Sequence, residues 1–176
     1  SPFILLIFLL IPLDSRGPVI YKSKRMGKHK KPFYVYKFRT MYPNSDHLSI
    51  TVGKRDPRIT RLGYYLRKFK LDELPQMFNV LKGDMSFVGP RPDVPDYSHH
   101  YARYNRNYFA MKPGITSYAS LYFVNESELY KHTDDPVGRY IYYTIPKKVE
   151  LDQEYLYKQG ILTDLFIIFA TLKKIF

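Results

Sequence analysis

The sequence predicts a small, helix-rich α/β domain that associates with a membrane surface through amphipathic helices and contains a few short strands. Its 176 residues are enough for one domain with a core of its own. Apolar residues recur at helical spacing in several segments, whereas few short segments have the character of strands. An apolar run at the N-terminus is followed closely by a cluster of cations, and this combination favours the membrane.

The composition narrows the classes of partner without choosing one. A formal net charge of +12 implies an anionic partner, which is nucleic acid, membrane lipid or a phosphorylated substrate. The absence of cysteine excludes a disulfide scaffold and a thiolate metal site. The 18 tyrosines and 12 phenylalanines suit a core, a membrane interface or the stacking of bases.

Residues 2–13 form an almost wholly apolar run that is too short to cross a bilayer alone, because a spanning helix needs about 20 apolar residues. The run also lacks the basic region and the cleavage site of a signal peptide. It is a buried core helix, half of a truncated span or one arm of a re-entrant hairpin. The cations that follow are Lys22, Lys24, Arg25, Lys28, Lys30 and Lys31. Since anionic lipid attracts such cations, we favour a membrane-facing cluster over a solvated basic loop.

Two strands are expected next. Val19–Tyr21 is a short strand candidate, and Phe33–Met41 alternates in the manner of a strand. The alternation would place Lys37 and Arg39 on one face of that strand, opposite an aromatic face.

The first helix after these strands is expected to start at Asp56, with Asp56 as its cap and Pro57 in the first turn. Its apolar stripe would be Ile59, Leu62, Leu66 and Phe69. Arg67 lies beside this stripe and is expected to point towards Asp72.

A pair of acids, Asp72 and Glu73, opens the next predicted helix. Asp72 is the expected N-cap, Pro75 is tolerable in a first turn, and Gly83 is the expected stop. The apolar stripe of this helix would be Leu74, Phe78 and Leu81. Both acids would then lie at a helix N-terminus, where the dipole and the free N–H groups favour negative charge, including a phosphate.

The second half of the chain is predicted to be mainly helical. Helices are expected in residues 97–108, in 126–143 with a break at Pro136, and in 146–157, whereas 117–123 is a loop or a strand. The tail, residues 161–176, is an amphipathic helix with cations near its end, suited to a core or to a membrane interface.

Cations surround the acid pair on both sides in the sequence: Arg67, Lys68, Lys70, Lys82 and Arg91. A bare carboxylate pair in such a frame suits chemistry on a phosphate. One carboxylate can attack or hold a metal ion, while the cations neutralise the phosphoryl oxygens.

Several motifs in one order resemble the bacterial sugar transferases, also called monotopic phosphoglycosyl transferases. They are the apolar run with Asp14-Ser15-Arg16-Gly17-Pro18-Val19, then Tyr36-Lys37-Phe38-Arg39-Thr40-Met41, Asp56-Pro57-Arg58-Ile59-Thr60-Arg61-Leu62-Gly63, Leu71-Asp72-Glu73-Leu74-Pro75-Gln76, Lys82-Gly83-Asp84-Met85-Ser86-Phe87-Val88-Gly89-Pro90-Arg91-Pro92, Pro113-Gly114-Ile115-Thr116 and a final helix with Asp164. The resemblance covers nearly the whole chain.

The resemblance implies transfer of a phosphosugar from a UDP-sugar to a polyprenol phosphate such as undecaprenyl phosphate, with UMP as the other product. It places the chain at the cytoplasmic face of the bacterial inner membrane as a monotopic protein, and it leaves a homodimer open. By position, Asp72 is the nucleophile that carries the phosphosugar, and Glu73 is its partner, as a metal ligand or as a base for the lipid phosphate. The implied cofactor is Mg²⁺, with Asp72 and Glu73 as its ligands.

A carboxylate attacks a dianionic diphosphate only when cations screen the charge. The candidates for this phosphate clamp are Lys37, Arg39, Arg67 and Arg91, with Pro92 beside the last. Asp84 and Asp152 match family positions and are candidates for supporting the metal or the site.

In the family the apolar segment is a re-entrant helix with a Ser-Pro break, and Ser1-Pro2 falls where that break is expected. Residues 1–13 would therefore be the outgoing arm and 14–176 a single catalytic domain, with the incoming arm missing. The chain departs from many relatives after Thr116, where residues 117–126 lack the usual arginine, which leaves nucleotide and sugar recognition open.

Two other classes of function stay open. A catalytically silent membrane scaffold would bind membrane without turnover. A basic, aromatic-rich domain could bind nucleic acid, but that function gives no reason for the apolar start or for the acids among cations, so we expect no nucleic-acid partner.

Overall fold

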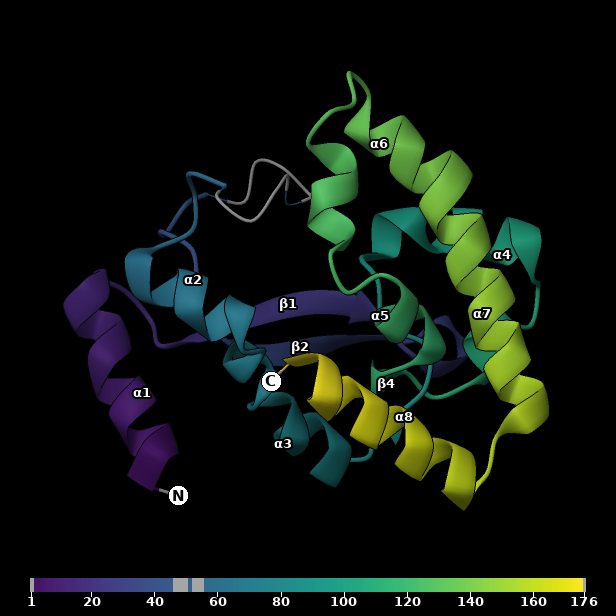
Figure 1. Cartoon of the computed structure of the whole chain (residues 1–176), viewed down its shortest axis with the longest axis horizontal. Helices are drawn as coiled ribbons and strands as arrows, with labels where there is room; N and C mark the ends of the chain where they lie inside the picture. The colour runs from purple at the N-terminus through teal and green to yellow at the C-terminus, as the bar shows by residue number, and fades with distance from the viewer. Residues whose placement is uncertain (1, 46–50, 52–55, 176) are drawn as a thin grey trace.

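The chain folds into a helix-rich α/β structure with two small sheets, as the sequence predicts (Figure 1). The computed structural model describes residues 2–45, 51 and 56–175, so Ser1 of the expected Ser-Pro break and Phe176 lie outside the described residues. Within these ranges, no helix combines the length and the apolar character needed to cross a bilayer.

The elements are as follows. The helices are α1 (Pro2–Asp14), α2 (Arg61–Lys68), α3 (Gln76–Leu81), α4 (Ser98–Tyr104), α5 (Tyr118–Tyr122), α6 (Pro136–Arg139), α7 (Ile145–Lys158) and α8 (Ile161–Ile175). Short 3-10 segments are η1 (Lys28–Lys30), η2 (Leu71–Glu73), η3 (Pro95–Tyr97), η4 (Tyr108–Ala110) and η5 (Glu126–Tyr130), and η6 (Tyr140–Thr144) is a π-helix. The strands are β1 (Ile20–Met26), β2 (Pro32–Phe38), β3 (Ser86–Val88) and β4 (Gly114–Thr116).

The hairpin of β1 and β2 is antiparallel, and its register pairs Ile20 with Phe38 and Met26 with Pro32. The strand expected at Val19–Tyr21 is longer than predicted and takes in the first cations of the basic cluster, which is therefore not a loop throughout. Pairing with the aromatic strand β2 explains the difference, because cross-strand partners such as a lysine opposite a tyrosine stabilise an extended backbone.

The apolar N-terminal run forms α1, which packs beside α2 in Figure 1. One stripe of α1 is buried, with Ile7 and Ile11 in a core that also contains Phe38 and Leu66. The rest of its apolar surface is exposed, as Leu13 shows. The helix is therefore only in part a core helix.

The helix expected from Asp56 begins later, at Arg61, so the prediction of Asp56 as its cap is wrong. Asp56 instead forms an ion pair with Arg58 at 2.7 Å, within a turn that precedes the helix. The cap of α2 is Thr60, whose hydroxyl accepts a hydrogen bond from the Gly63 N–H at 3.0 Å. The Asp56 carboxylate also accepts from the Arg58 N–H at 3.0 Å, so it is occupied within this turn.

The short helix α3 buries polar residues and exposes apolar ones, contrary to the predicted stripe. Phe78 is 65% exposed and Leu81 82% exposed, while Gln76 and Asn79 are buried. The reason is that the Asn79 amide completes the free edge of β2: it accepts from the Tyr36 N–H at 3.1 Å and donates to the Tyr34 carbonyl at 2.7 Å.

The end of α3 is as predicted. Gly83 has φ +83, and its N–H donates to the Val80 carbonyl while the Asp84 N–H donates to the Asn79 carbonyl. These two bonds form a Schellman motif, which favours glycine at the left-handed position.

A second core lies among the helices of the second half, at the other end of the molecule in Figure 1. Its buried residues are Tyr101, Tyr108, Phe109, Tyr130, Tyr140, Ile145 and Val149. The helix expected in residues 146–157 is present as α7, whereas those expected in 97–108 and 126–143 are divided into shorter pieces. Residues 118–122 form α5 where a loop or strand was predicted. Ser117 caps α5 by accepting from the Ser120 N–H at 3.0 Å, a cap signal that sequence reasoning overlooked.

Asp152 lies in this second core and not among the cations around Asp72. Its Oδ2 accepts from the Tyr108 hydroxyl at 2.8 Å, while its Oδ1 has no hydrogen-bond partner. Burial raises the pKa of Asp152 to about 7, against the opposing effects of Tyr108, Lys148 and Ser117.

We expect Asp152 to make stability depend on pH. Because the pKa of Asp152 is raised in the folded state, ionising it opposes folding, so stability falls as the pH rises from about 4 to about 7. Asp152→Asn should therefore melt at a higher temperature than the wild type at pH 8, and the difference should shrink at pH 5. Thermal unfolding at both pH values checks this.

The control for this test is Asp135→Asn, which changes an exposed cap of α6 to a residue that caps equally well. A difference between Asp152→Asn and wild type that stays constant from pH 5 to pH 8 would contradict the expectation.

Candidate active site

Asp72 and Glu73 lie in the 3-10 turn η2, between α2 and α3. Lys70 precedes them in a left-handed conformation, with φ +54, and turns the chain out of α2. The prediction that Asp72 caps the next helix is wrong, because α3 begins at Gln76 with Pro75 as its N-cap. Pro75 has no N–H to donate into the preceding turn, so the hydrogen bonding of α3 does not extend back to the acids, although Leu74 has helical backbone angles. The acids lie instead in the first turn of η2.

Glu73 is held by two cations from different parts of the chain. The Lys37 ammonium from β2 lies 3.1 Å from Oε1. Arg91 spans both carboxylate oxygens, donating from Nη1 to Oε2 at 3.1 Å and from Nη2 to Oε1. Burial alone would raise the pKa of Glu73, but Arg91 and Lys37 outweigh it and hold the pKa well below its usual value. Glu73 is thus ionised with both oxygens occupied.

Asp72 has the opposite environment. Its side chain is buried, at 7% exposed, and its Oδ1 has no hydrogen-bond partner. Burial raises the pKa of Asp72, the neighbouring charge of Glu73 adds to this, and Lys37, Arg67 and Lys70 oppose it. When the environments of two adjacent carboxylates push their pKa values apart, the two groups commonly have different roles in an active site.

Gln76 is a feature of the site that sequence reasoning missed. It follows Asp72 by one helical turn, it is 1% exposed, and its Nε2 has no hydrogen-bond partner. A buried amide without a partner is a donor available to a ligand. The predicted stripe of Leu74, Phe78 and Leu81 leaves Gln76 on the polar face, so the sequence held no signal of its burial.

Of the four cations predicted to clamp a phosphate, three lie near the acids and Arg39 does not. Lys37 and Arg91 contact Glu73 directly. Arg67, at the end of α2, donates to the Thr51 hydroxyl at 3.2 Å and its charge acts on Asp72. Of the predicted clamp, these three cations are therefore the ones whose charges act on the acid pair.

Arg39 binds away from the acids. Its buried guanidinium donates to the carbonyl oxygens of Pro18 at 2.6 Å, Ser15 at 2.6 Å and Gly17 at 3.3 Å, and to the Ser15 hydroxyl. The Arg39 N–H donates to the Val19 carbonyl at 2.8 Å, so the pairing of the hairpin continues one residue past the end of β2, and a face shared with Lys37 stays a prediction. Arg39 holds the turn after α1 and is not free to clamp a phosphate.

The remaining predicted residues lie around these. Pro92 separates Arg91 from Asp93 and lines a small hollow with both of them. Asp84 follows the end of α3 and lies at the limit of hydrogen-bond distance, 3.5 Å, from the Asn79 amide. Asp84 therefore adjoins the helix that supports the acids, and its contact is with Asn79.

In the described part of the chain, no group of three or more histidine, aspartate or glutamate side chains is arranged to hold a metal ion. Mg²⁺ needs fewer protein ligands, since one or two carboxylates commonly hold it together with substrate phosphates and water. The unpartnered Oδ1 of Asp72 fits such a role. Glu73 fits it less well, because both of its oxygens are ion-paired.

Comparison with known proteins relates the whole chain to one family. Residues 1–176 match the family model described as bacterial sugar transferase. The chain is 38% identical over 186 residues to the undecaprenyl-phosphate glucose phosphotransferase of Komagataeibacter xylinus, covering 99% of this chain and 32% of that protein. It is 36% identical over 179 residues to the UDP-N-acetylgalactosamine-undecaprenyl-phosphate N-acetylgalactosaminephosphotransferase of Aeromonas hydrophila, covering 99% of this chain and 39% of that protein.

A third relative is similar in length. The exopolysaccharide production protein PSS of Rhizobium leguminosarum bv. phaseoli is 38% identical over 187 residues, covering 97% of this chain and 84% of that protein. The chain thus spans about a third of the length of the first two relatives and most of the third. With a match along all of its residues and several relatives above 30% identity, the chain belongs to the bacterial sugar transferase family.

Proposed function

We propose that this domain transfers a sugar 1-phosphate from a UDP-sugar to a polyprenol phosphate such as undecaprenyl phosphate, with release of UMP. The names of the Komagataeibacter and Aeromonas relatives support the acceptor and the class of donor. The observation that carries the proposal is the pairing of a buried, unpartnered carboxylate, Asp72, with a neighbour, Glu73, that two cations hold in place.

The proposed reaction has two displacements at one phosphorus atom. In the first, the ionised Asp72 forms a bond from a carboxylate oxygen to the β-phosphorus, the bond from that phosphorus to the bridging oxygen breaks, and UMP leaves with this oxygen. In the second, an oxygen of the polyprenol phosphate attacks the same phosphorus and the bond to Asp72 breaks. The carboxylate is regenerated, and the product is a polyprenyl diphosphate sugar.

The cations around the acids supply what these steps require. An anion attacks an anionic diphosphate only if the charge on the phosphoryl oxygens is neutralised. Lys37, Arg67 and Arg91 face the acid pair and suit this role. We include Mg²⁺ in the proposal, held through Asp72 and the diphosphate oxygens, where it would neutralise further charge on the phosphoryl group. Glu73 would then serve to hold Lys37 and Arg91, since a carboxylate with a lowered pKa is a poor base.

The exposed apolar surface supports a monotopic attachment to the cytoplasmic face of the bacterial membrane, where a polyprenol phosphate resides. Figure 1 shows α3 and α8 along the lower side of the view, with the N-terminal end of α1 at its lower left. Their exposed large apolar residues include Leu5, Leu9, Leu13, Met77, Phe78, Leu81, Leu162, Phe166 and Phe169. Surfaces of this kind mark interaction with a membrane or a protein, and a lipid substrate favours the membrane.

Asp72→Asn should abolish the covalent step. With Mg²⁺ and a panel of UDP-sugars, the wild-type chain should gain the mass of one phosphosugar and release UMP, whereas Asp72→Asn should gain nothing and release UMP at least about 10³-fold more slowly. The variant should still fold, because it removes a buried charge that has no hydrogen bond on Oδ1. Intact-mass spectrometry and a UMP assay measure both quantities.

Asp135→Asn on the exposed cap of α6 is the control and should behave as wild type. A wild type that gains no mass with UDP-sugar alone and releases UMP only when a polyprenol phosphate is added would show direct transfer. A folded wild type with neither adduct nor UMP across the panel would favour the scaffold.

Membrane attachment predicts a second result. Replacing Phe166 and Phe169 of α8 with serine should weaken binding to lipid vesicles by about 10-fold or more for each residue, because burying a phenylalanine contributes about 1.5–3 kcal/mol. Vesicle flotation measures this. The double replacement of Tyr142 and Tyr143 by serine, on exposed residues of η6, is the control. Equal losses in the two double variants would argue against attachment through α8.

A further inference from the structure

Arg91 is carried by a loop, Gly89–Asp93, that has few hydrogen bonds of its own. Pro90 and Pro92 flank the arginine, and neither has an N–H to donate. Prolines also fix the backbone angle φ on both sides of Arg91. The position of the guanidinium therefore depends on how the two ends of the loop are attached to the rest of the structure.

The first end is attached to β4 and the segment before it. The Gly89 N–H donates to the Thr116 carbonyl at 3.0 Å, and the Gly114 N–H donates to the Pro90 carbonyl at 3.0 Å. A Cβ on Gly114 would lie 2.2 Å from the Gly89 nitrogen, so the two backbones are in direct contact here. The Arg91 guanidinium adds a bond to the Ile115 carbonyl at 3.2 Å.

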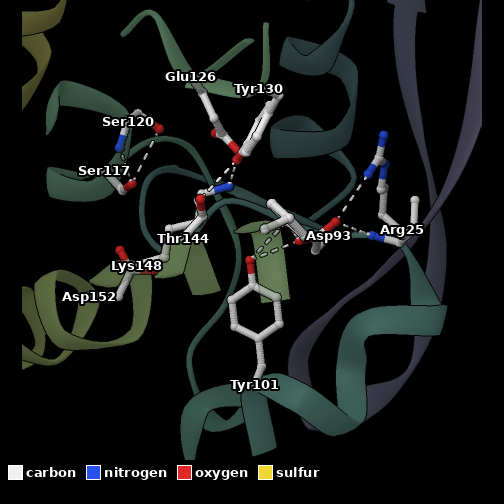
Figure 2. A network of polar contacts seen from close by, with 12 residues as sticks. Arg25, Asp93, Tyr101, Ser117, Ser120, Glu126, Tyr130, Thr144, Lys148 and Asp152 are labelled. Atoms are coloured by element: carbon white, nitrogen blue, oxygen red, sulfur yellow. Dashed lines mark hydrogen bonds and ion pairs between the residues drawn. The ribbon is translucent and has the colours of Figure 1, made fainter. Parts of the chain in front are cut away.

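The second end is attached through Asp93, on which donors from three elements converge. Its carbonyl accepts from the Met26 N–H of β1 at 2.8 Å. Its carboxylate accepts from the Tyr101 hydroxyl of α4 at 2.8 Å and from the Tyr140 hydroxyl of η6, and it lies 3.6 Å from the Arg25 guanidinium. Figure 2 shows Asp93 between Tyr101 and Arg25.

This attachment is more than a surface contact. Tyr101 and Tyr140 are buried in the second core, and the Asp93 side chain is largely buried as well. A buried carboxylate costs free energy unless donors satisfy it, and the two hydroxyls satisfy Oδ2 while the Val94 N–H and Arg25 satisfy Oδ1. Burial and the adjacent carboxylate keep the pKa of Tyr101 well above its usual value, so its hydroxyl remains a donor.

We propose that Asp93, held by Tyr101 and Tyr140, is a positioning residue for Arg91. The carboxylate fixes the end of the loop two residues after Arg91, and the rigid Pro92 transmits this position to the arginine. The guanidinium is thereby held where it spans both oxygens of Glu73 and faces the bound diphosphate. The inference rests on the proposed function, to which it adds a link between the helical second core and the acid pair.

A purely structural role for the hydroxyls is the other explanation, and Tyr130 separates the two. Tyr130 is buried in the same core, and its hydroxyl donates to Glu126 at 3.0 Å and contacts the Thr144 hydroxyl at 2.9 Å. Within the described residues, the partners of the Asp93 carboxylate are Tyr101, Tyr140, Arg25 and the Val94 N–H, and Tyr130 is not among them. Tyr130→Phe therefore removes a comparable buried hydroxyl without touching the loop.

The test measures UMP release at varied UDP-sugar concentrations with a polyprenol phosphate present as acceptor, together with thermal unfolding, for Tyr101→Phe, Tyr140→Phe and Tyr130→Phe. All three should lower the melting temperature by similar amounts. Tyr101→Phe and Tyr140→Phe should lower kcat/KM by about 10- to 100-fold, because a misplaced phosphate contact is costly, whereas Tyr130→Phe should stay within about twofold of wild type.

A double-mutant cycle shows whether the effect passes through Arg91. In an Arg91→Lys background, Tyr140→Phe should cause less than about threefold further loss, since residues that act as one unit are not additive. Full additivity, or an effect of Tyr140→Phe on kcat/KM no larger than that of Tyr130→Phe, would overturn the inference while leaving an active wild type and the proposed function intact. A wild type that releases no UMP would overturn the proposed function and the inference with it.

Discussion

The ion pairs of Glu73 with Lys37 and Arg91 are the interaction on which the rest of the site depends. They join the turn η2 to strand β2 and to the loop after β3, three segments far apart in the sequence. They also keep two adjacent carboxylates in different states. Glu73 is ionised and fully occupied, whereas Asp72 is buried with Oδ1 unpartnered and its pKa raised. A site with one anchored and one available carboxylate suits transfer of a phosphoryl group better than it suits binding of a nucleic acid, whose phosphates two buried acids would repel.

The surrounding fold serves to place these ion pairs, and it does so with buried polar groups as much as with apolar packing. Asn79 fastens α3 to the edge of β2, which fixes Lys37 and the acid turn relative to each other. Asp93 fastens the loop of Arg91 to the second core. Because buried polar groups are costly when they lose a partner, such contacts define one arrangement more sharply than a contact between apolar residues would. Apolar side chains of α1, α3 and α8 that do not pack in the cores remain exposed, where they are available to a lipid surface.

Sequence reasoning identified the acid pair, Lys37 and Arg91 because their chemistry is carried by residue type and motif order. It did not predict the position of a side chain where that position depends on a partner distant in the sequence. Nothing near Arg39 indicates that it turns back to Ser15 and Pro18, and nothing in residues 74–81 shows that Asn79 is needed at the edge of β2. Periodicity describes one segment at a time, and these contacts form only between segments. The late start of α2 at Arg61 is a different case, because the ion pair that occupies Asp56 is local.

The most direct test of the central claim is to find which carboxylate carries the phosphosugar. The wild-type chain would be quenched shortly after mixing with Mg²⁺ and its UDP-sugar, digested, and sequenced by tandem mass spectrometry across residues 71–82. Our account predicts the added mass on Asp72, because Glu73 is held by Lys37 and Arg91 with both oxygens occupied. The added mass on Glu73 would contradict it, since the ion pairs would then mark the nucleophile and not its anchor.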